Sequence, residues 1–190
     1  MRVRLGYVAI ALALPNVTSS GNVTYSAYQR IVSEEKRFEK LKQVAYKNIL
    51  DLGKILKYNA ENDIHFYRIT SALIPLATHP EVNWDYRRLS KIDLKILGDF
   101  IKQNNMRVDT HPDQFNVINS VDDSVVESTM RNLWFHVNLF EDLEYPHGRM
   151  VLHVGSAAGG KEAALKRFER NFRTYPDEIT SKLILENDDK

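Results

Sequence analysis

The chain has 190 residues, of which 43% are hydrophobic and 27% are charged, and its formal net charge at pH 7 is only +1. This length and composition are typical of one globular domain, so we predict a single domain over residues 1–190. The small net charge gives no indication of nucleic-acid binding, so any attraction to phosphates must come from a local patch. The absence of cysteine excludes disulfides and thiolate metal sites.

The first residues contain a short apolar run, Val8-Ala-Ile-Ala-Leu-Ala-Leu14, which follows two arginines. This pattern mimics a signal peptide, but the run is short and its residues also suit a first barrel strand, which we favour. No stretch approaches the roughly 20 apolar residues that a membrane span requires. We therefore expect a cytoplasmic protein without a membrane partner.

Short apolar runs alternate along the chain with amphipathic stretches that are long enough for helices. In chain order we expect a strand from Val3 to Ala9, a helix from Tyr25 to Lys57, a strand at Phe66–Ile69, a helix from Arg88 to Asn104, a strand ending at His111, a helix from Ser124 to Leu143, a strand reaching His153, a helix from Lys161 to Tyr175 and a strand from Lys182 to Glu186. The third helix is expected to begin with a capping box, Ser124-Val-Val-Glu127.

Strict alternation of strands and helices predicts an α/β protein with a parallel sheet and right-handed crossovers. A closed TIM (β/α)8 barrel usually needs about 250 residues. We therefore predict an incomplete TIM barrel with five parallel strands and four helices, and we interpret the chain as the front part of a longer protein. A naturally open five-stranded sheet is the alternative.

Four potential metal ligands lie at or just past the ends of apolar runs: His79, His111, His153 and Glu186. The carboxyl ends of barrel strands gather at one mouth, so we expect these side chains to converge there. Three imidazoles and a carboxylate suit zinc, manganese or iron. A glutamate that bridges two divalent ions would further suit hydrolysis of a phosphodiester.

The remaining three histidines are interpreted as structural. His65 precedes a strand and His147 lies in a turn, so both are expected to be exposed. His136 lies in the middle of a helix among aromatic residues and is expected in the core or at its boundary.

The loop after the third strand begins His111-Pro-Asp-Gln-Phe115, which sets an amide and an aromatic ring beside a predicted ligand. Gln114 and Phe115 would suit a wedge that enters a DNA duplex, although Phe115 packed on the barrel rim is the alternative. Tyr7, just past the first strand, is expected to add a second ring near the same mouth. Arg68, within the second strand, is either ion-paired internally or directed at phosphate.

Several separated blocks of the sequence resemble motifs of the UV damage endonuclease family, in the same order. They are Arg4-Leu-Gly-Tyr7, Arg68-Ile-Thr-Ser71 with Pro75 and His79-Pro80, His111-Pro-Asp-Gln-Phe115, His153-Val-Gly155 with Gly160-Lys161 and Arg167-Phe168, and Leu185-Glu-Asn-Asp-Asp-Lys190. The resemblance implies a TIM barrel related to endonuclease IV. It also implies divalent metal ions, commonly manganese with zinc or magnesium as alternatives, and nicking of damaged double-stranded DNA on the 5′ side of UV photoproducts and some abasic sites.

The same resemblance implies roles for individual residues. It makes His79, His111, His153 and Glu186 metal ligands, with the last three at the catalytic centre. It also makes Gln114 and Phe115 the pair that probes the lesion, helped by Tyr7, while Arg68 is our own candidate for a DNA contact.

The sequence departs from the family in two respects. Phe115 stands where the family often has tyrosine, so a hydroxyl is lost from the probing pair. The later ligands, expected on strands six to eight, are not in the chain, so we expect an incomplete metal site, little nicking and self-association through exposed strand edges. The alternatives are a metal-dependent sugar isomerase or epimerase on a related barrel, and a non-catalytic module that binds lesions.

Overall fold

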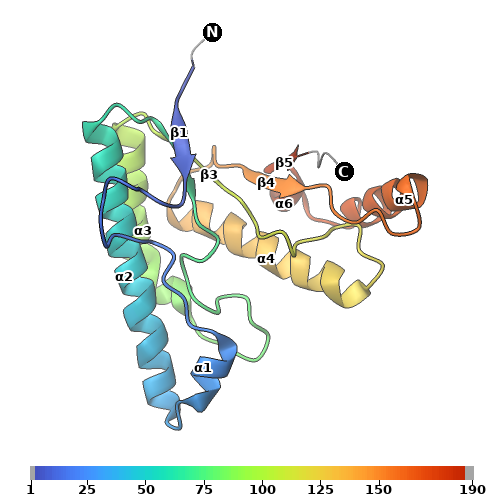
Figure 1. The fold of residues 1–190 in the computed structure, drawn as a ribbon, viewed down its shortest axis with the longest axis horizontal. Coiled ribbons are helices and arrows are strands. Elements are labelled where there is room, and N and C mark those ends of the chain that lie inside the picture. Colours follow the sequence, from blue (N-terminus) through green and yellow to red (C-terminus); the bar gives the residue numbers. More distant parts are fainter. Residues whose placement is uncertain (1–2, 187–190) are drawn as a thin grey trace.

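The computed structural model describes residues 3–186, which form one parallel sheet with helices between successive strands (Figure 1). The strands follow one another in the sheet in the order β1-β2-β3-β4-β5. In chain order the elements are β1 (Gly6–Val8), α1 (Tyr25–Arg30), α2 (Glu34–Glu61), β2 (Phe66–Ile69), α3 (Tyr86–Gln103), β3 (Arg107–Thr110), α4 (Asp123–Asp142), β4 (Met150–His153), α5 (Lys161–Phe172), α6 (Asp177–Thr180) and β5 (Leu183–Glu186). The predicted α/β alternation with five parallel strands is therefore confirmed.

Successive strand residues point to opposite faces of the sheet, and the two faces are buried very differently. Tyr67, Val108 and Met150 are each 0% exposed and belong to the hydrophobic core between the sheet and the helices. On the opposite face, Val8 is 52% exposed and Ile184 is 40% exposed. Helices thus cover one face of this sheet, and its concave inner face lies open.

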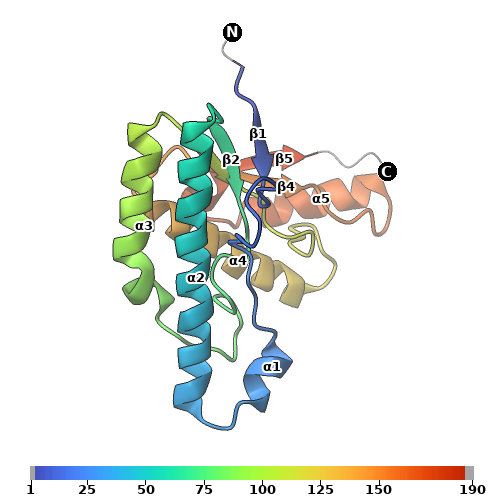
Figure 2. The same ribbon diagram turned by 60° about the vertical axis from the view of Figure 1, so that its left-hand side comes forward.

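The helices pack in chain order around the covered face. α2 lies beside α3, and α3 in turn contacts α4 (Figure 2). An arginine on α3 fixes the second of these contacts, because Arg87 donates from Nε and Nη2 to Asp142 of α4, at 3.0 and 2.7 Å. Asp142 is buried, so this ion pair leaves no unpaired carboxylate between the two helices.

The expected single helix from Tyr25 to Lys57 is wrong, because the structure has two helices there. α1 ends at Arg30, and Ile31 takes an extended conformation with φ −77° and ψ 114°. Ser33 then caps α2, accepting a hydrogen bond from the Lys36 amide at 3.4 Å. A serine before two glutamates is a strong start signal that outweighs the continuous apolar spacing.

Other element boundaries also differ from the prediction. α4 is capped by Asp122, whose Oδ1 accepts from the Ser124 amide at 2.9 Å, so the predicted Ser124–Glu127 capping box is wrong. The fourth predicted helix ends at Phe172, and the separate short helix α6 follows Pro176. The described residues therefore contain six helices in place of four. Within the same residues, no helix is long and apolar enough to cross a membrane.

Candidate metal centre

Three of the four predicted ligands lie together at the carboxyl ends of three neighbouring strands. One donor atom from each of His111, His153 and Glu186 lies within 4.8 Å of the other two. Nε2 of His111 is 3.2 Å from Oε2 of Glu186, and the rings of His111 and His153 meet edge to face with centroids 4.9 Å apart. Only 24% of the His111 side chain is exposed, against 48% of the Glu186 side chain, so the cluster opens towards solvent on the side of β5.

The register of the sheet explains how residues so distant in sequence meet. β4 and β5 are paired in parallel so that His153 stands directly opposite Glu186. The pairing of Thr110 with Met150 in turn brings the residue after β3, His111, to the same end of the sheet. Parallel strands of similar length therefore place all three side chains at one mouth.

A second charged layer lies below the cluster on the inner face. Arg68 of β2 stands opposite Asp109 of β3, two residues before His111 and therefore on the same face of the strand. Asp109 is 3% exposed and receives hydrogen bonds from the Arg107 side chain at 3.0 Å and the Arg149 amide at 3.0 Å. Asp109 was not predicted from the sequence, although the spacing Asp109-x-His111 on one strand indicates two side chains on the same face.

Arg68 has no such partner within the part of the chain that the structure describes. Its Nε is buried without a hydrogen bond, and none of the ion pairs there includes Arg68. The structure therefore does not show the internal ion pair that was one of the two expectations for Arg68, the other being a contact with phosphate. The guanidinium borders a hollow of the inner face that Glu186 also borders.

The donor set fits a divalent cation. Two imidazoles and one carboxylate within mutual reach are the nitrogen and oxygen ligands that zinc, manganese and iron accept. The hydrogen bond between His111 and Glu186 also holds the two donors at the spacing that an ion would bridge. The residues therefore fit a divalent metal ion.

His79 is not brought to this cluster. It lies in the loop between β2 and α3, where its ring stacks on Tyr25 with centroids 4.0 Å apart. Its Nδ1 accepts a hydrogen bond from the Glu81 amide at 3.3 Å. A long loop is positioned by such tertiary contacts, which the strand-end rule does not predict.

Tyr7 also lies elsewhere than expected. It is in the middle of β1, and its hydroxyl donates to Oδ1 of Asn59 on α2 at 2.6 Å. Its ring meets Tyr67 edge to face with centroids 5.3 Å apart. The side chain therefore points to the helix layer, and the expected position past the strand, near the mouth, is wrong.

Gln114 and Phe115 project from the loop that follows β3. Both side chains are exposed. Because Phe115 is 75% exposed, it does not pack on the barrel rim, which was the alternative expectation for this residue. Hydrogen bonds hold the residues on either side of this pair in place. Asp113 accepts from the Ser71 hydroxyl at 2.9 Å, and Asn116 donates to the Asp113 carbonyl at 2.8 Å. An exposed aromatic ring on an anchored loop is suited to contact a partner.

The other histidines have the surroundings that a structural role requires, with one difference. His136 is 2% exposed, and burial together with the nearby His111 lowers its pKa to about 3, so its ring is neutral. His147 is exposed as expected. His65 is half-buried rather than exposed, and its Nδ1 has no hydrogen-bond partner.

Comparison with known proteins gives one consistent result. The UV-endonuclease UvdE family matches residues 3–190. The UV DNA damage endonuclease of Halalkalibacterium halodurans is 35% identical over 192 residues, covering 100% of this chain and 60% of that relative. The enzyme of the same name from Bacillus pumilus is 35% identical over 191 residues, covering 100% of this chain and 59% of the relative.

A solved structure agrees with the sequence matches. The crystal structure of SacUVDE superposes with a TM-score of 0.89 at 37% identity, over 100% of this chain and 62% of that one. This likeness confirms the predicted TIM-barrel class, of which the chain forms a five-stranded part. The chain spans about 60% of the length of the relatives it matches.

Proposed function

Because this chain belongs to the UV-endonuclease UvdE family, we propose that it carries the metal-binding and lesion-contacting part of a DNA repair nuclease. The reaction is hydrolysis of a phosphodiester on the 5′ side of UV photoproducts and some abasic sites in double-stranded DNA. Membership of the family also decides against a sugar isomerase or epimerase. A non-catalytic role in lesion binding remains the competitor for the 190-residue chain itself.

The observation that carries the proposal is the cluster of His111, His153 and Glu186 at the open mouth of the sheet. We propose that these residues hold a divalent cation, manganese in the first place. When bound there, such an ion would supply Lewis-acid chemistry: it would polarise a phosphate oxygen and make a water more acidic. The exposure of Glu186 leaves room for a substrate group at the solvent side of the cluster.

The surrounding residues supply binding and orientation in this proposal. Phe115 stacks against the damaged dinucleotide or a neighbouring base, and Gln114 offers its amide to base edges exposed by the lesion. Arg68, on the same inner face as the cluster and without an ion pair among the described residues, binds a phosphate oxygen. Tyr7 is assigned no contact with DNA, because its hydroxyl is bonded to Asn59 in the helix layer.

The lesion-contacting part of the proposal is tested by equilibrium binding. Fluorescence anisotropy with UV-irradiated and unirradiated duplexes, at fixed salt and with Mn²⁺ present, measures lesion selectivity. We expect the irradiated duplex to bind more tightly, and Phe115→Ala to remove most of the difference, because stacking contributes about 1–3 kcal/mol per base. Val121→Ala, which truncates an apolar side chain that is 69% exposed farther along the same loop, is the matched control. Equal affinity for both duplexes in the unmodified chain would refute the lesion role.

The catalytic part is tested by incision of UV-irradiated plasmid. Three donors suffice for one ion, whereas two-metal hydrolysis needs further ligands, so we expect the 190-residue chain to bind lesions and nick them weakly. Strong nicking that Glu186→Gln abolishes would overturn that expectation while supporting the family reaction in this chain. Lesion-selective binding without any nicking would identify the chain as a binding module.

A further inference from the structure

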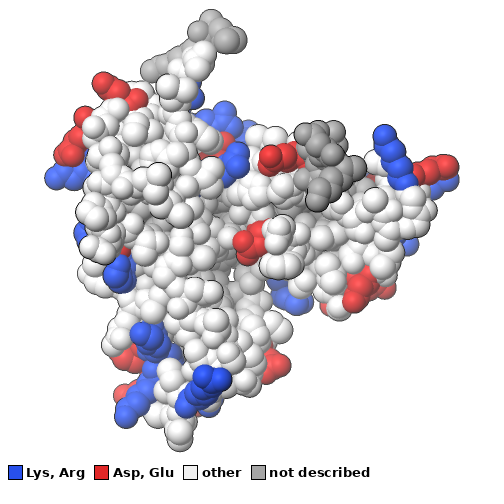
Figure 3. Space-filling model, viewed as in Figure 1, with Lys and Arg blue, Asp and Glu red and all other residues white. Residues whose placement is uncertain are grey.

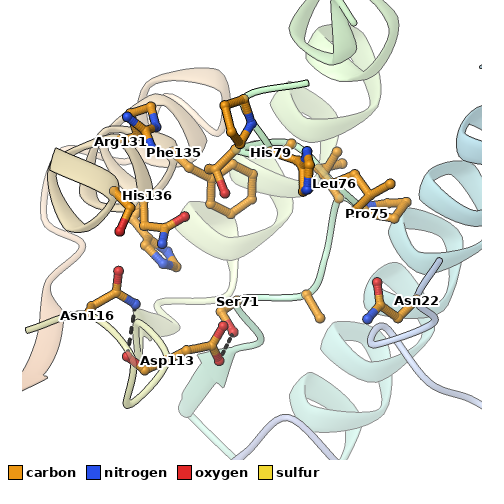
Figure 4. Close-up of a pocket in the computed structure, with 17 residues that line it drawn as sticks. Asn22, Ser71, Pro75, Leu76, His79, Asp113, Asn116, Arg131, Phe135 and His136 are labelled. Carbon is orange, nitrogen blue, oxygen red and sulfur yellow. Dashed lines mark hydrogen bonds between the residues drawn. The ribbon is translucent and has the colours of Figure 1, made fainter. Parts of the chain in front are cut away.

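A pocket of about 340 Å³ lies beside the metal cluster, between the loop after β2 and the middle of α4 (Figure 4). Asp113, two residues after His111, forms one side of it, where the Ser71 hydroxyl is hydrogen-bonded to the Asp113 carboxylate. Arg131, Phe135 and His136 of α4 form another side, and Figure 4 draws Arg131 near the top of the view and Asp113 near the bottom. The pocket therefore reaches from the base of the Phe115 loop to an arginine on a helix.

Arg131 is exposed, and its guanidinium is not engaged by the protein. Among residues 3–186 no group forms a hydrogen bond or an ion pair with it. The neighbouring Asn132 and Ser128 lie on the same helical face and also line the pocket, so they add polar groups beside the cation. An arginine with all five donors unused at a pocket rim is suited to grip an anion.

The low net charge of the chain bears on how this arginine could bind a polyanion. On the face shown in Figure 3, Lys and Arg are scattered among Asp and Glu, in keeping with a net charge of +1. On this face, attraction of a polyanion therefore depends on single groups placed along its path rather than on a broad basic surface. Arg131 is an exposed cation that lines the pocket, and Asp113 is the one carboxylate among the lining residues.

We propose that this pocket is a phosphate subsite for the DNA strand, with Arg131 holding a backbone phosphate that flanks the one at the metal cluster. The proposal rests on the proposed function and extends it to a second contact. A strand whose phosphate lies at His111 and whose bases meet Phe115 continues over the adjoining loop ends, and this pocket opens there. The apolar wall of Pro75, Leu76 and Phe135 accommodates the sugar next to the bound phosphate.

The test is the salt dependence of binding to an undamaged duplex, measured for the 190-residue chain by fluorescence anisotropy. Loss of one phosphate contact lowers the slope of log K against log salt by about 0.9. We expect Arg131→Ala to show this change and to bind about three- to tenfold more weakly at low salt. Arg131→Lys, which keeps the charge, should retain most of the slope. Arg173→Ala is the matched control, because Arg173 is exposed at the far end of α5 and pairs only with Glu169 among the described residues.

The outcomes separate this subsite from its alternatives. An unchanged slope in Arg131→Ala, or an equal change in Arg173→Ala, overturns the proposal. Titration with inorganic phosphate tests whether the pocket binds free phosphate instead. If phosphate stabilises the wild type against unfolding and Arg131→Ala removes this effect without changing the salt slope of DNA binding, a role in DNA binding is contradicted. The probe is an undamaged duplex, so this test is independent of lesion selectivity and incision, which test the proposed function. A lower slope in Arg131→Ala therefore supports the subsite even if both of those are absent.

Discussion

At the scale of single residues, the candidate ligands are distinguished by what else holds them. His111 and Glu186 contact each other across 3.2 Å, and both donors face the open mouth. His79, by contrast, has its ring stacked on Tyr25 and its Nδ1 engaged by the Glu81 amide. Thus the His111 ring lies where it can bind a metal, whereas the His79 ring is held by contacts within its loop and with α1.

Glu186 supplies the only negative charge of the three-residue cluster, so its neutralisation should weaken metal binding most. We expect Glu186→Gln to lower the affinity for Mn²⁺ by more than about tenfold, since an amide oxygen is a weaker ligand for a hard cation. Isothermal titration calorimetry measures the effect. Glu178→Gln, which changes an exposed carboxylate of α6, is the control and should bind Mn²⁺ as the wild type does. Equal affinity in Glu186→Gln would remove this residue from the site.

His79 gives a second prediction, which distinguishes the three ligands that the structure brings together from the four that the sequence predicted. We expect His111→Ala to weaken Mn²⁺ binding by more than about tenfold and His79→Ala to change it by less than about twofold, because only His111 lies in the cluster. The same calorimetric titration tests both variants. A comparable loss in His79→Ala would show that the loop after β2 rearranges to bring a fourth ligand to the ion.

At the scale of elements, the loops after β3 and β4 are joined by a pair of hydrogen bonds. Asn119, which is 2% exposed, donates from Nδ2 to the Ser156 carbonyl and accepts at Oδ1 from the Ser156 amide, both at 2.8 Å. The Asn119 side chain fits here because residue 155 is a glycine: a Cβ at Gly155 would lie 2.6 Å from Oδ1 of Asn119. The loop that presents Phe115 is thereby fixed to the loop that follows His153.

This junction predicts a difference between two glycines. Gly155 and Gly160 both have positive φ, at 102° and 89°, but a Cβ on Gly160 would meet nothing within 4 Å. Alanine at either site incurs the backbone strain, and alanine at 155 also displaces Asn119 and breaks its two part-buried hydrogen bonds to Ser156. We expect Gly155→Ala to lower the free energy of unfolding by about 2 kcal/mol more than Gly160→Ala does. Urea unfolding of the two variants measures the difference, and equal losses would refute the junction.

The elements also show what the sequence could predict. Strand positions and their order followed from short apolar runs separated by helix-length stretches, and the convergence of His111, His153 and Glu186 followed from parallel register. The break before Ser33 was missed because the apolar spacing continues through it, although the cap signal was present.

Residues outside the regular pattern were harder to place. A three-residue strand such as β1 gives too few positions to decide which face Tyr7 occupies. His79 is placed by a ring on α1 that lies 54 positions earlier in the chain, and no local signal encodes that contact. Arg131 was not singled out, because a polar residue on an amphipathic helix is ordinarily interpreted as a solvated one.

At the scale of the whole molecule, the sheet has two unpaired edges and one uncovered face within the residues described. β1 pairs only with β2, and β5 pairs only with β4. Apolar side chains of both outer strands remain accessible, with Val8 52% and Ile184 40% exposed. Free strand edges beside exposed apolar residues are templates for pairing with another chain.

We therefore expect the 190-residue chain to self-associate reversibly, with a weight-average mass that rises with concentration in sedimentation equilibrium. A lysine placed at the edge opposes pairing, because its charge must be buried or repelled. Leu5→Lys, directly before β1, should shift the equilibrium towards monomer, whereas Leu12→Lys, at a residue 93% exposed outside the strands, should not. If the unmodified chain is monomeric at high concentration, the open edges are protected by features other than pairing. If both lysine variants dissociate equally, the contact uses general surface apolarity and not the β1 edge.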